Sequence, residues 1–217
     1  MKHLSILVLG AASLTAAQPS SVSGLMLYAV GGTGGLGGGL GYHFNEIITL
    51  RGELATFTYD DSFDQDGITY RGDLKLATQA LYLDVHPFGG TFRLTVGVDN
   101  GRTRFGGTAV ADGSGEVDVN GTLYPLPAGE SITAEVRYPS TMPYLGIGWG
   151  LAGSGLNVGL DLGVNIGTAD LVMTRSENLG LIPGFDADFE AQRALYANDV
   201  ADIKVFPIIK LSVGYSF

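Results

Sequence analysis

The segment LNVGLDLGVNIG, residues 156–167, alternates strictly between large aliphatic side chains and small or polar ones. One parity carries the aliphatic residues Leu156, Val158, Leu160, Leu162, Val164 and Ile166. The other parity carries Asn157, Gly159, Asp161, Gly163, Asn165 and Gly167. Because successive side chains of a β-strand point to opposite faces, the segment is predicted to be a strand with one apolar face and one narrow, polar face.

The same alternation recurs in residues 48–58, 92–99 and 205–217. A soluble sheet can also alternate in this way, but here small or charged residues oppose large aliphatic residues throughout the chain. Each apolar face suits lipid, and each opposite face suits a narrow lumen. The pattern therefore predicts an all-β chain folded as an antiparallel transmembrane β-barrel.

The predicted connections between strands alternate in length. The short ones are residues 45–46, 89–90 and 152–155, and the long ones are residues 61–68, 111–131 and 177–202. Outer-membrane barrels have short periplasmic turns and longer extracellular loops. We therefore expect the short turns to face the periplasm and the long loops to face the outside.

These connections separate seven strands, at residues 35–44, 47–60, 69–88, 91–109, 132–150, 156–175 and 203–217. Single-chain bacterial barrels use an even number of strands, and the first of the seven runs toward the periplasm. We therefore place a preceding strand at residues 25–30, turning through residues 31–35, which predicts an eight-stranded barrel. A single long first strand that begins outside, or a seven-stranded sheet, stays open as an alternative.

The composition excludes several classes of protein. The chain of 217 residues is 45% hydrophobic and 16% charged with 34 glycines, which is too apolar and glycine-rich for an ordinary soluble enzyme. The net charge of −10 excludes nucleic-acid binding, which depends on cationic side chains. Without cysteine there is no disulfide scaffold. Residues 24–45 are uncharged, but eight of the eleven residues 31–41 are glycine, which disfavours a transmembrane helix.

Residues 1–17 have the pattern of a secretory signal peptide. Residues 2–3 form a basic start, residues 4–14 an apolar stretch, and residues 15–17 a cleavage site of small side chains. We expect residues 18–217 to form the outer-membrane β-barrel.

The predicted strands at residues 69–88 and 132–150 are longer than the stretch of about 9–11 residues that a tilted strand needs to cross a bilayer, so their outer ends should project beyond it. Charged residues of outward parity then lie outside the lipid: Arg71, Asp73, Lys75, Glu135 and Arg137. Residues 117–124 around Asn120-Gly121 are predicted to form an extra hairpin, because Asn-Gly favours a type I′ turn. Residues 186–201 are predicted to form a short helix.

The C-terminal residues from Val205 to Phe217, with Tyr215 among them, are apolar at alternate positions and resemble the terminal strand that the barrel-insertion machinery recognises. Further segments resemble an uncharacterised family of proteobacterial eight-stranded outer-membrane barrels: LYLDVHPFGGTFRLTVGV at 81–98, PYLGIGWG at 143–150, GLNVGLDLGV at 155–164, and GLGYHFN and LRGEL within 39–54. More loosely, the chain is similar to OmpW-like and opacity-type surface antigens.

The resemblance implies that the protein lies in the outer membrane of a Gram-negative cell, with outer-membrane lipids and the barrel-insertion machinery as partners. It supplies no catalytic residue. The residues themselves lead us to expect no enzyme and no cofactor, because an acyl-cleaving enzyme needs a nucleophile with a base near the outer leaflet, whereas His43 and His86 lie beside the short turns. The acidic segment 60–67 lacks the glutamate of a calcium loop, so we predict a solvated loop and no metal site.

Aromatic residues group at two levels, as in the interfacial girdles of transmembrane barrels. Near the short turns are Tyr42, Phe44, Phe88, Phe92, Trp149, Tyr215 and Phe217, and near the long loops are Phe57, Tyr59, Tyr70, Phe105, Tyr138 and Tyr144. Phe57, Tyr59 and Tyr144 have lumenal parity and are predicted to plug the upper barrel. An aromatic-ligand site is the alternative.

Six charged residues of lumenal parity are predicted to form one cluster: Arg51, Glu53, Asp84, Arg93, Asp161 and Lys210. An eight-stranded barrel has an interior only wide enough for side chains, and unpaired ions there are costly to desolvate. We therefore predict salt-bridged pairs that close the lumen, the alternative being that each charge has its own water-filled pocket.

The predicted function is structural, or the binding of an unknown surface ligand through the loops. The alternative is a small channel or transporter for apolar or small solutes. An apolar rim above a glycine-lined inner wall would favour transport, and the candidate glycines are Gly146, Gly148, Gly150, Gly159 and Gly163.

Overall fold

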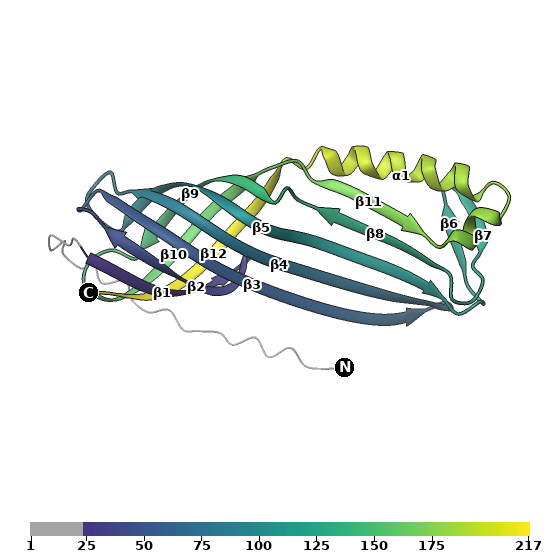
Figure 1. The fold of residues 1–217 in the computed structure, drawn as a ribbon, viewed down its shortest axis with the longest axis horizontal. Coiled ribbons are helices and arrows are strands. Elements are labelled where there is room, and N and C mark those ends of the chain that lie inside the picture. The colour runs from purple at the N-terminus through teal and green to yellow at the C-terminus, as the bar shows by residue number, and fades with distance from the viewer. Residues whose placement is uncertain (1–23) are drawn as a thin grey trace.

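The structure, a computed structural model, describes residues 24–217, so the predicted signal peptide at residues 1–17 lies outside the described residues. Eight strands close into an antiparallel ring (Figure 1). In order around the ring they are β1 (Gly24–Gly32), β2 (Gly35–His43), β3 (Ile48–Gln65), β4 (Ile68–Val85), β5 (Phe92–Ala111), β9 (Thr141–Gly150), β10 (Gly155–Ile166) and β12 (Val205–Ser216). Pairing of β1 with β12 and of β5 with β9 closes the ring, which confirms the predicted eight-stranded barrel.

The first strand lies where the alternation and the even strand count place it. The predicted strand at residues 25–30 is β1, and it is separate from β2, which excludes a single long first strand and a seven-stranded sheet. The turn between the two strands occupies only Thr33 and Gly34, so it is shorter than the predicted residues 31–35.

Strands β3, β4 and β5 continue beyond the ring and form a curved sheet, the extension (Figure 1). There β5 pairs with β8 (Ser131–Arg137), and β8 pairs with β11 (Asp170–Arg175). The predicted single strands at residues 132–150 and 156–175 are therefore wrong, because each is two strands. Pro139 lies in the first break, where it has no N–H to donate to a ladder.

The connection between β3 and β4 corrects a second prediction. Residues 61–68 are not a long loop, because both strands run on to a two-residue turn at Asp66 and Gly67. Their φ angles of 51° and 77° are those of a type I′ turn, which Asp-Gly favours. The acidic segment thus lies on an exposed strand and its turn. Among residues 24–217 no group of three or more His, Asp or Glu side chains is arranged to hold a metal ion.

The far end of the extension is a folded tip. It contains the hairpin β6 (Glu116–Val119) and β7 (Thr122–Pro125), the 3-10 helix η1 (Glu177–Leu181) and the helix α1 (Phe185–Ala201), which lies along β11 (Figure 1). The predicted hairpin around Asn120-Gly121 and the predicted helix are both confirmed. The tip has its own core: Ile68, Ala111, Val119, Tyr124, Leu126, Leu179, Phe185 and Phe189. No helix among residues 24–217 is long and apolar enough to span a bilayer.

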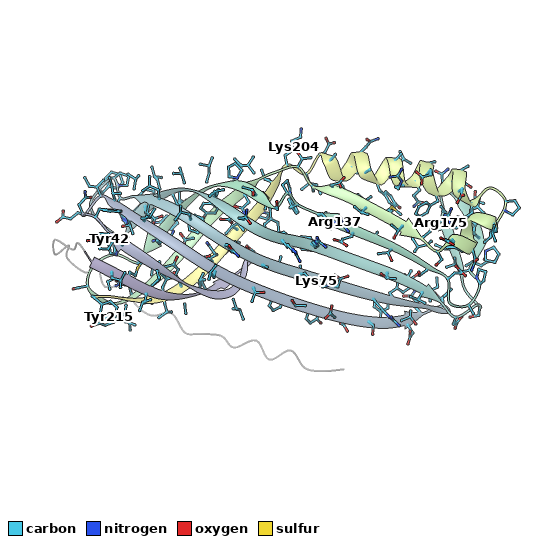
Figure 2. The ribbon with its side chains drawn as sticks, in the orientation of Figure 1. Tyr42, Lys75, Arg137, Arg175, Lys204 and Tyr215 are labelled. Carbon is cyan, nitrogen blue, oxygen red and sulfur yellow. The ribbon has the colours of Figure 1, made fainter. Side chains whose placement is uncertain are left out.

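Outward side chains of the ring form an apolar belt. Among its aliphatic members, the following are each between 45% and 63% exposed: Leu27, Leu40, Leu54, Val96, Leu145, Val158, Leu211 and Val213. Figure 2 shows Tyr42 and Tyr215 on the outside at the short-turn end of the barrel. Residues of the opposite parity fill the lumen.

Candidate functional site

All six residues of the predicted charge cluster lie inside the barrel, each 4% exposed or less. They come from five strands: Arg51 and Glu53 from β3, Asp84 from β4, Arg93 from β5, Asp161 from β10 and Lys210 from β12. The structure brings them together in two connected layers.

The layer nearer the short turns joins two arginines to two aspartates. Arg51 donates to both oxygens of Asp84, with Nε–Oδ2 2.5 Å and Nη2–Oδ1 3.0 Å, and also to Asp161 Oδ1 at 3.2 Å. Arg93 Nη2 donates to the same Asp161 oxygen at 2.8 Å, and Arg93 Nη1 donates to the carbonyl of Gly150 at 2.5 Å. The hydroxyl of Thr95 donates to Asp84 Oδ1 at 2.7 Å. This layer therefore spans the lumen from β3 to β10.

The second layer is built around Lys210. Its Nζ donates to Glu53 Oε1 at 2.8 Å and to the hydroxyl of Tyr82 at 3.1 Å. The Tyr82 hydroxyl in turn donates to Asp99 Oδ1 at 2.6 Å, and Asn165 Nδ2 donates to Asp99 Oδ2 at 2.7 Å. Asp99 is thus a fourth carboxylate, absent from the predicted cluster. Its parity is lumenal, so its place in strand 92–99 could have identified it.

Strand register explains why Arg93 reaches Asp161. Arg93, Gly148 and Asp161 stand side by side on β5, β9 and β10. Gly148 has no side chain, and a Cβ there would lie 2.7 Å from the Arg93 guanidinium. The Arg93 side chain therefore passes over Gly148 and reaches the carboxylate of Asp161.

The Tyr144 side chain likewise lies over two glycines that have no side chain to obstruct it. A Cβ on Gly146 or on Gly163 would overlap the Tyr144 phenol, whose ring centroid is 4.9 Å from that of Tyr82. Three of the five inner-wall glycines that could have lined an open passage, Gly146, Gly148 and Gly163, are therefore covered by the side chains of Tyr144 and Arg93. A Cβ on Gly159 would meet Ser212 and Leu151, and a Cβ on Gly150 would meet the backbone of Val158.

Aromatic rings also hold the cations in place. Lys210 Nζ lies 4.3 Å from the Tyr82 ring centroid, and the Arg51 guanidinium lies 5.3 Å from it. Such contacts stabilise a desolvated cation. Within the part of the chain that the structure describes, Arg51 Nη1, Arg93 Nε and Asp161 Oδ2 have no hydrogen-bond partner.

The predicted aromatic plug is partly wrong. Tyr144 is buried in the lumen, but Phe57 and Tyr59 are 37% and 54% exposed because β3 continues past the ring. At this level Phe206 and Ile208 of β12 are buried and pack in one cluster with Tyr144. The Phe206 ring centroid lies 5.2 Å from Tyr138 and 6.1 Å from Phe105.

The two histidines lie at the short-turn end, as predicted. His43 Nδ1 is 2.7 Å from the Thr49 hydroxyl, which is 3.4 Å from His86 Nε2. His86 Nδ1 is 2.9 Å from the Gly90 carbonyl. Burial lowers the pKa of His86, so at neutral pH its ring is uncharged. The absence of enzymatic activity stays a prediction.

The C-terminal residues lie on the outside of the barrel. Phe217 is 66% exposed, and its amide donates to the Leu25 carbonyl of β1 at 3.0 Å. Its ring packs edge-on against Tyr215, with centroids 5.2 Å apart. The role of both residues in membrane insertion stays a prediction.

Comparison with known proteins supports the fold. No family model matches the chain, and no curated protein matches it. The crystal structure of Acinetobacter baumannii CarO2 is similar at 19% identity and a TM-score of 0.64, covering 92% of this chain and 100% of that one. The crystal structure of Acinetobacter baumannii CarO is similar at 21% identity and a TM-score of 0.61, covering 89% and 98%. The similarity to OmpW-like and opacity-type proteins stays a prediction.

Proposed function

We propose that the protein is an integral outer-membrane barrel with a closed lumen, and that it has a structural or surface-binding role through the extension. The apolar belt around the ring suits the hydrocarbon of a bilayer. The CarO proteins, which share the fold, are outer-membrane proteins of a Gram-negative cell, and this supports the same location here.

The main support for a closed lumen is the pairing of Arg93 and Arg51 with Asp161. This contact joins opposite parts of the wall through buried charges. Above it lie Lys210 with Glu53, and above these the apolar residues at the mouth. A solute that crossed the barrel would have to break these ion pairs, and a broken pair leaves an uncompensated buried charge.

The extension supplies the surface for binding. Its tip is folded around its own core, yet it presents apolar side chains outward: Leu123, Leu181, Leu195 and Tyr196. Surface connections held on a rigid scaffold commonly carry binding functions. We place the surface-binding role on η1, α1 and the β6–β7 hairpin.

Two measurements test the proposal. The protein should fractionate with outer membranes and migrate faster unboiled than boiled on a detergent gel, whereas recovery as a soluble periplasmic species would refute the membrane location. In planar bilayers the wild-type protein should pass no steady current, and Arg93→Ala should pass more. Large steady currents through the wild type would instead favour a small channel or transporter.

A further inference from the structure

The outer wall of the barrel is hollowed where three neighbouring strands carry small outward residues. These are Ala29 on β1, Gly38 on β2 and Gly52 on β3. The resulting groove has a volume of about 970 Å³. Larger apolar side chains border it: Leu27, Leu40, Leu54, Leu81, Val98 and Val213. The groove has the apolar lining that suits an acyl chain.

A second groove continues the first toward the extension. The two share Leu54, Gln79 and Asn100, and the second has a volume of about 740 Å³. The lining of the second groove is apolar where it meets the first groove and cationic at the other end, where Arg102, Arg104 and Arg137 lie. The two grooves together form an amphipathic surface.

The level of the arginines matches the outer edge of a bilayer. A tilted strand crosses the hydrocarbon in about 9–11 residues. Arg102 is ten residues beyond Phe92, the first residue of β5, and Arg137 ends β8, just beyond the ring strand β9. Figure 2 shows Arg137 and Lys75 where the barrel gives way to the extension.

The lining of the second groove holds three arginines and no carboxylate, although the whole chain has a net charge of −10. Arg137 Nε lies 2.6 Å and Arg104 Nε 3.5 Å from Glu135, and Lys75 lies 3.3 Å from Asp73. The hydrogen bond from Arg137 keeps the pKa of Glu135 below its usual range, so this carboxylate is ionised at neutral pH. Asp60 stands opposite Asp73 and Asp170 opposite Arg137 in the strand register, so carboxylates also lie beside these cations. The positive charge is therefore confined to the lining of the second groove, where Arg102 forms no salt bridge with any residue that the structure describes.

We propose that this wall binds a phosphorylated lipid of the outer leaflet, with an acyl chain in the apolar groove and a phosphate on Arg102, Arg104 and Arg137. Guanidinium groups bind phosphate oxygens through paired charge-assisted hydrogen bonds. Lipid A, which carries both acyl chains and phosphates, has the required chemistry. The inference rests on the proposed membrane location.

Native mass spectrometry of the whole protein, purified from membranes in mild detergent, tests whether the arginines bind the lipid phosphate. The wild type should bind lipid A about tenfold more tightly than dephosphorylated lipid A, the loss expected when charge-assisted hydrogen bonds are removed. The variant Arg102→Gln/Arg104→Gln should lose this preference. Arg193→Gln, on the exposed face of α1, is the matched control and should keep it.

The groove is tested by filling it. A Cβ on Gly52 would meet nothing within 4 Å, so Gly52→Leu should fold and obstruct the groove. It should weaken lipid A binding about tenfold, as expected when one well-packed chain is displaced. Gly72→Leu, at an equally open position in the extension, should bind as the wild type does.

The outcomes separate this inference from the membrane proposal. A wild-type barrel that shifts on heating but binds both lipids equally overturns the lipid site alone. Displacement of the lipid by inorganic phosphate at equal concentration also overturns it, because the acyl chain would then contribute nothing. A wild-type protein that shows no heat-dependent shift overturns the membrane proposal itself.

Discussion

Arg51 and Asp84 form a two-point ion pair across neighbouring strands, with both side chains 1% exposed. The same arginine also reaches Asp161 on the opposite part of the wall. Removal of one partner from such a network leaves a buried charge unpaired, which is strongly destabilising, whereas removal of both partners is far less so. The same buried ion pairs are therefore expected to stabilise the folded barrel and to block its lumen.

The first prediction concerns the Arg93–Asp161 pair. Arg93→Ala or Asp161→Ala alone should lower the free energy of unfolding by about 3–5 kcal/mol, and the double variant should lose much less than the sum. Urea unfolding in detergent measures this cycle. The exposed pair Arg193–Glu190 is the control, with a coupling of about 0–1 kcal/mol. Additive losses in the lumen would mean that the charges are solvated separately.

The second prediction concerns the last residue. Deletion of Phe217 should reduce the amount of protein inserted in the outer membrane, because this residue continues the pairing of β12 with β1 and resembles the insertion signal. Leu195→Ala, on the exposed side of α1, should leave insertion unchanged. Quantitative immunoblots of membrane fractions measure both. Equal levels of the two variants would count against the terminal signal.

The third prediction concerns topology. Protease added to intact cells should cut within residues 111–131 and 177–202, because the tip and its connections lie at the end of the extension. Residues 89–90 join β4 to β5 at the opposite end and should be protected. Cleavage there in intact cells would mean that the barrel is inverted.

Alternation along the strands predicts which face of a strand each residue occupies, and this is enough to place the six charged residues in the lumen. It does not predict where β3 leaves the ring, which is why Phe57 and Tyr59 have lumenal parity but are exposed. It cannot predict that Asp161 is shared by Arg51 and Arg93, because that depends on the register between strands distant in sequence. Register also places Asp99 beside Tyr82.

The errors in the predicted strands have local causes. The loop predicted at residues 61–68 overlooks Asp66-Gly67, which carries the same kind of turn signal as Asn120-Gly121. The prediction of one strand over residues 132–150 runs through Pro139, where the ladder changes from β8 to β9. The groove on the outer wall leaves no signal in the alternation, because it arises from small residues on three strands that only the barrel brings together.

The last prediction concerns the tip at low pH. Asp188 of α1 accepts hydrogen bonds from the Tyr124 hydroxyl at 2.6 Å and from Asn120 Nδ2 at 3.1 Å. These bonds, that from Tyr124 foremost, hold the pKa of Asp188 below its usual range. A carboxyl group whose pKa is lower in the folded state stabilises that state fully above the unfolded pKa, about 3.9, and this contribution is lost as the pH falls through the folded value.

Hydrogen exchange of the α1 amides, corrected for intrinsic rates, should therefore show weaker protection in the wild type at about pH 3 than at about pH 7. Tyr124→Phe should weaken the protection at about pH 7 and reduce the difference in protection between the two pH values. The reason is that the hydrogen bond from residue 124 to Asp188 is then absent at both pH values. Tyr70→Phe, on the exposed sheet where Tyr70 stacks on Phe63, is the control and should keep the wild-type difference. If Tyr124→Phe behaved as Tyr70→Phe does, the contact between α1 and the β6–β7 hairpin would not depend on the Asp188 carboxylate.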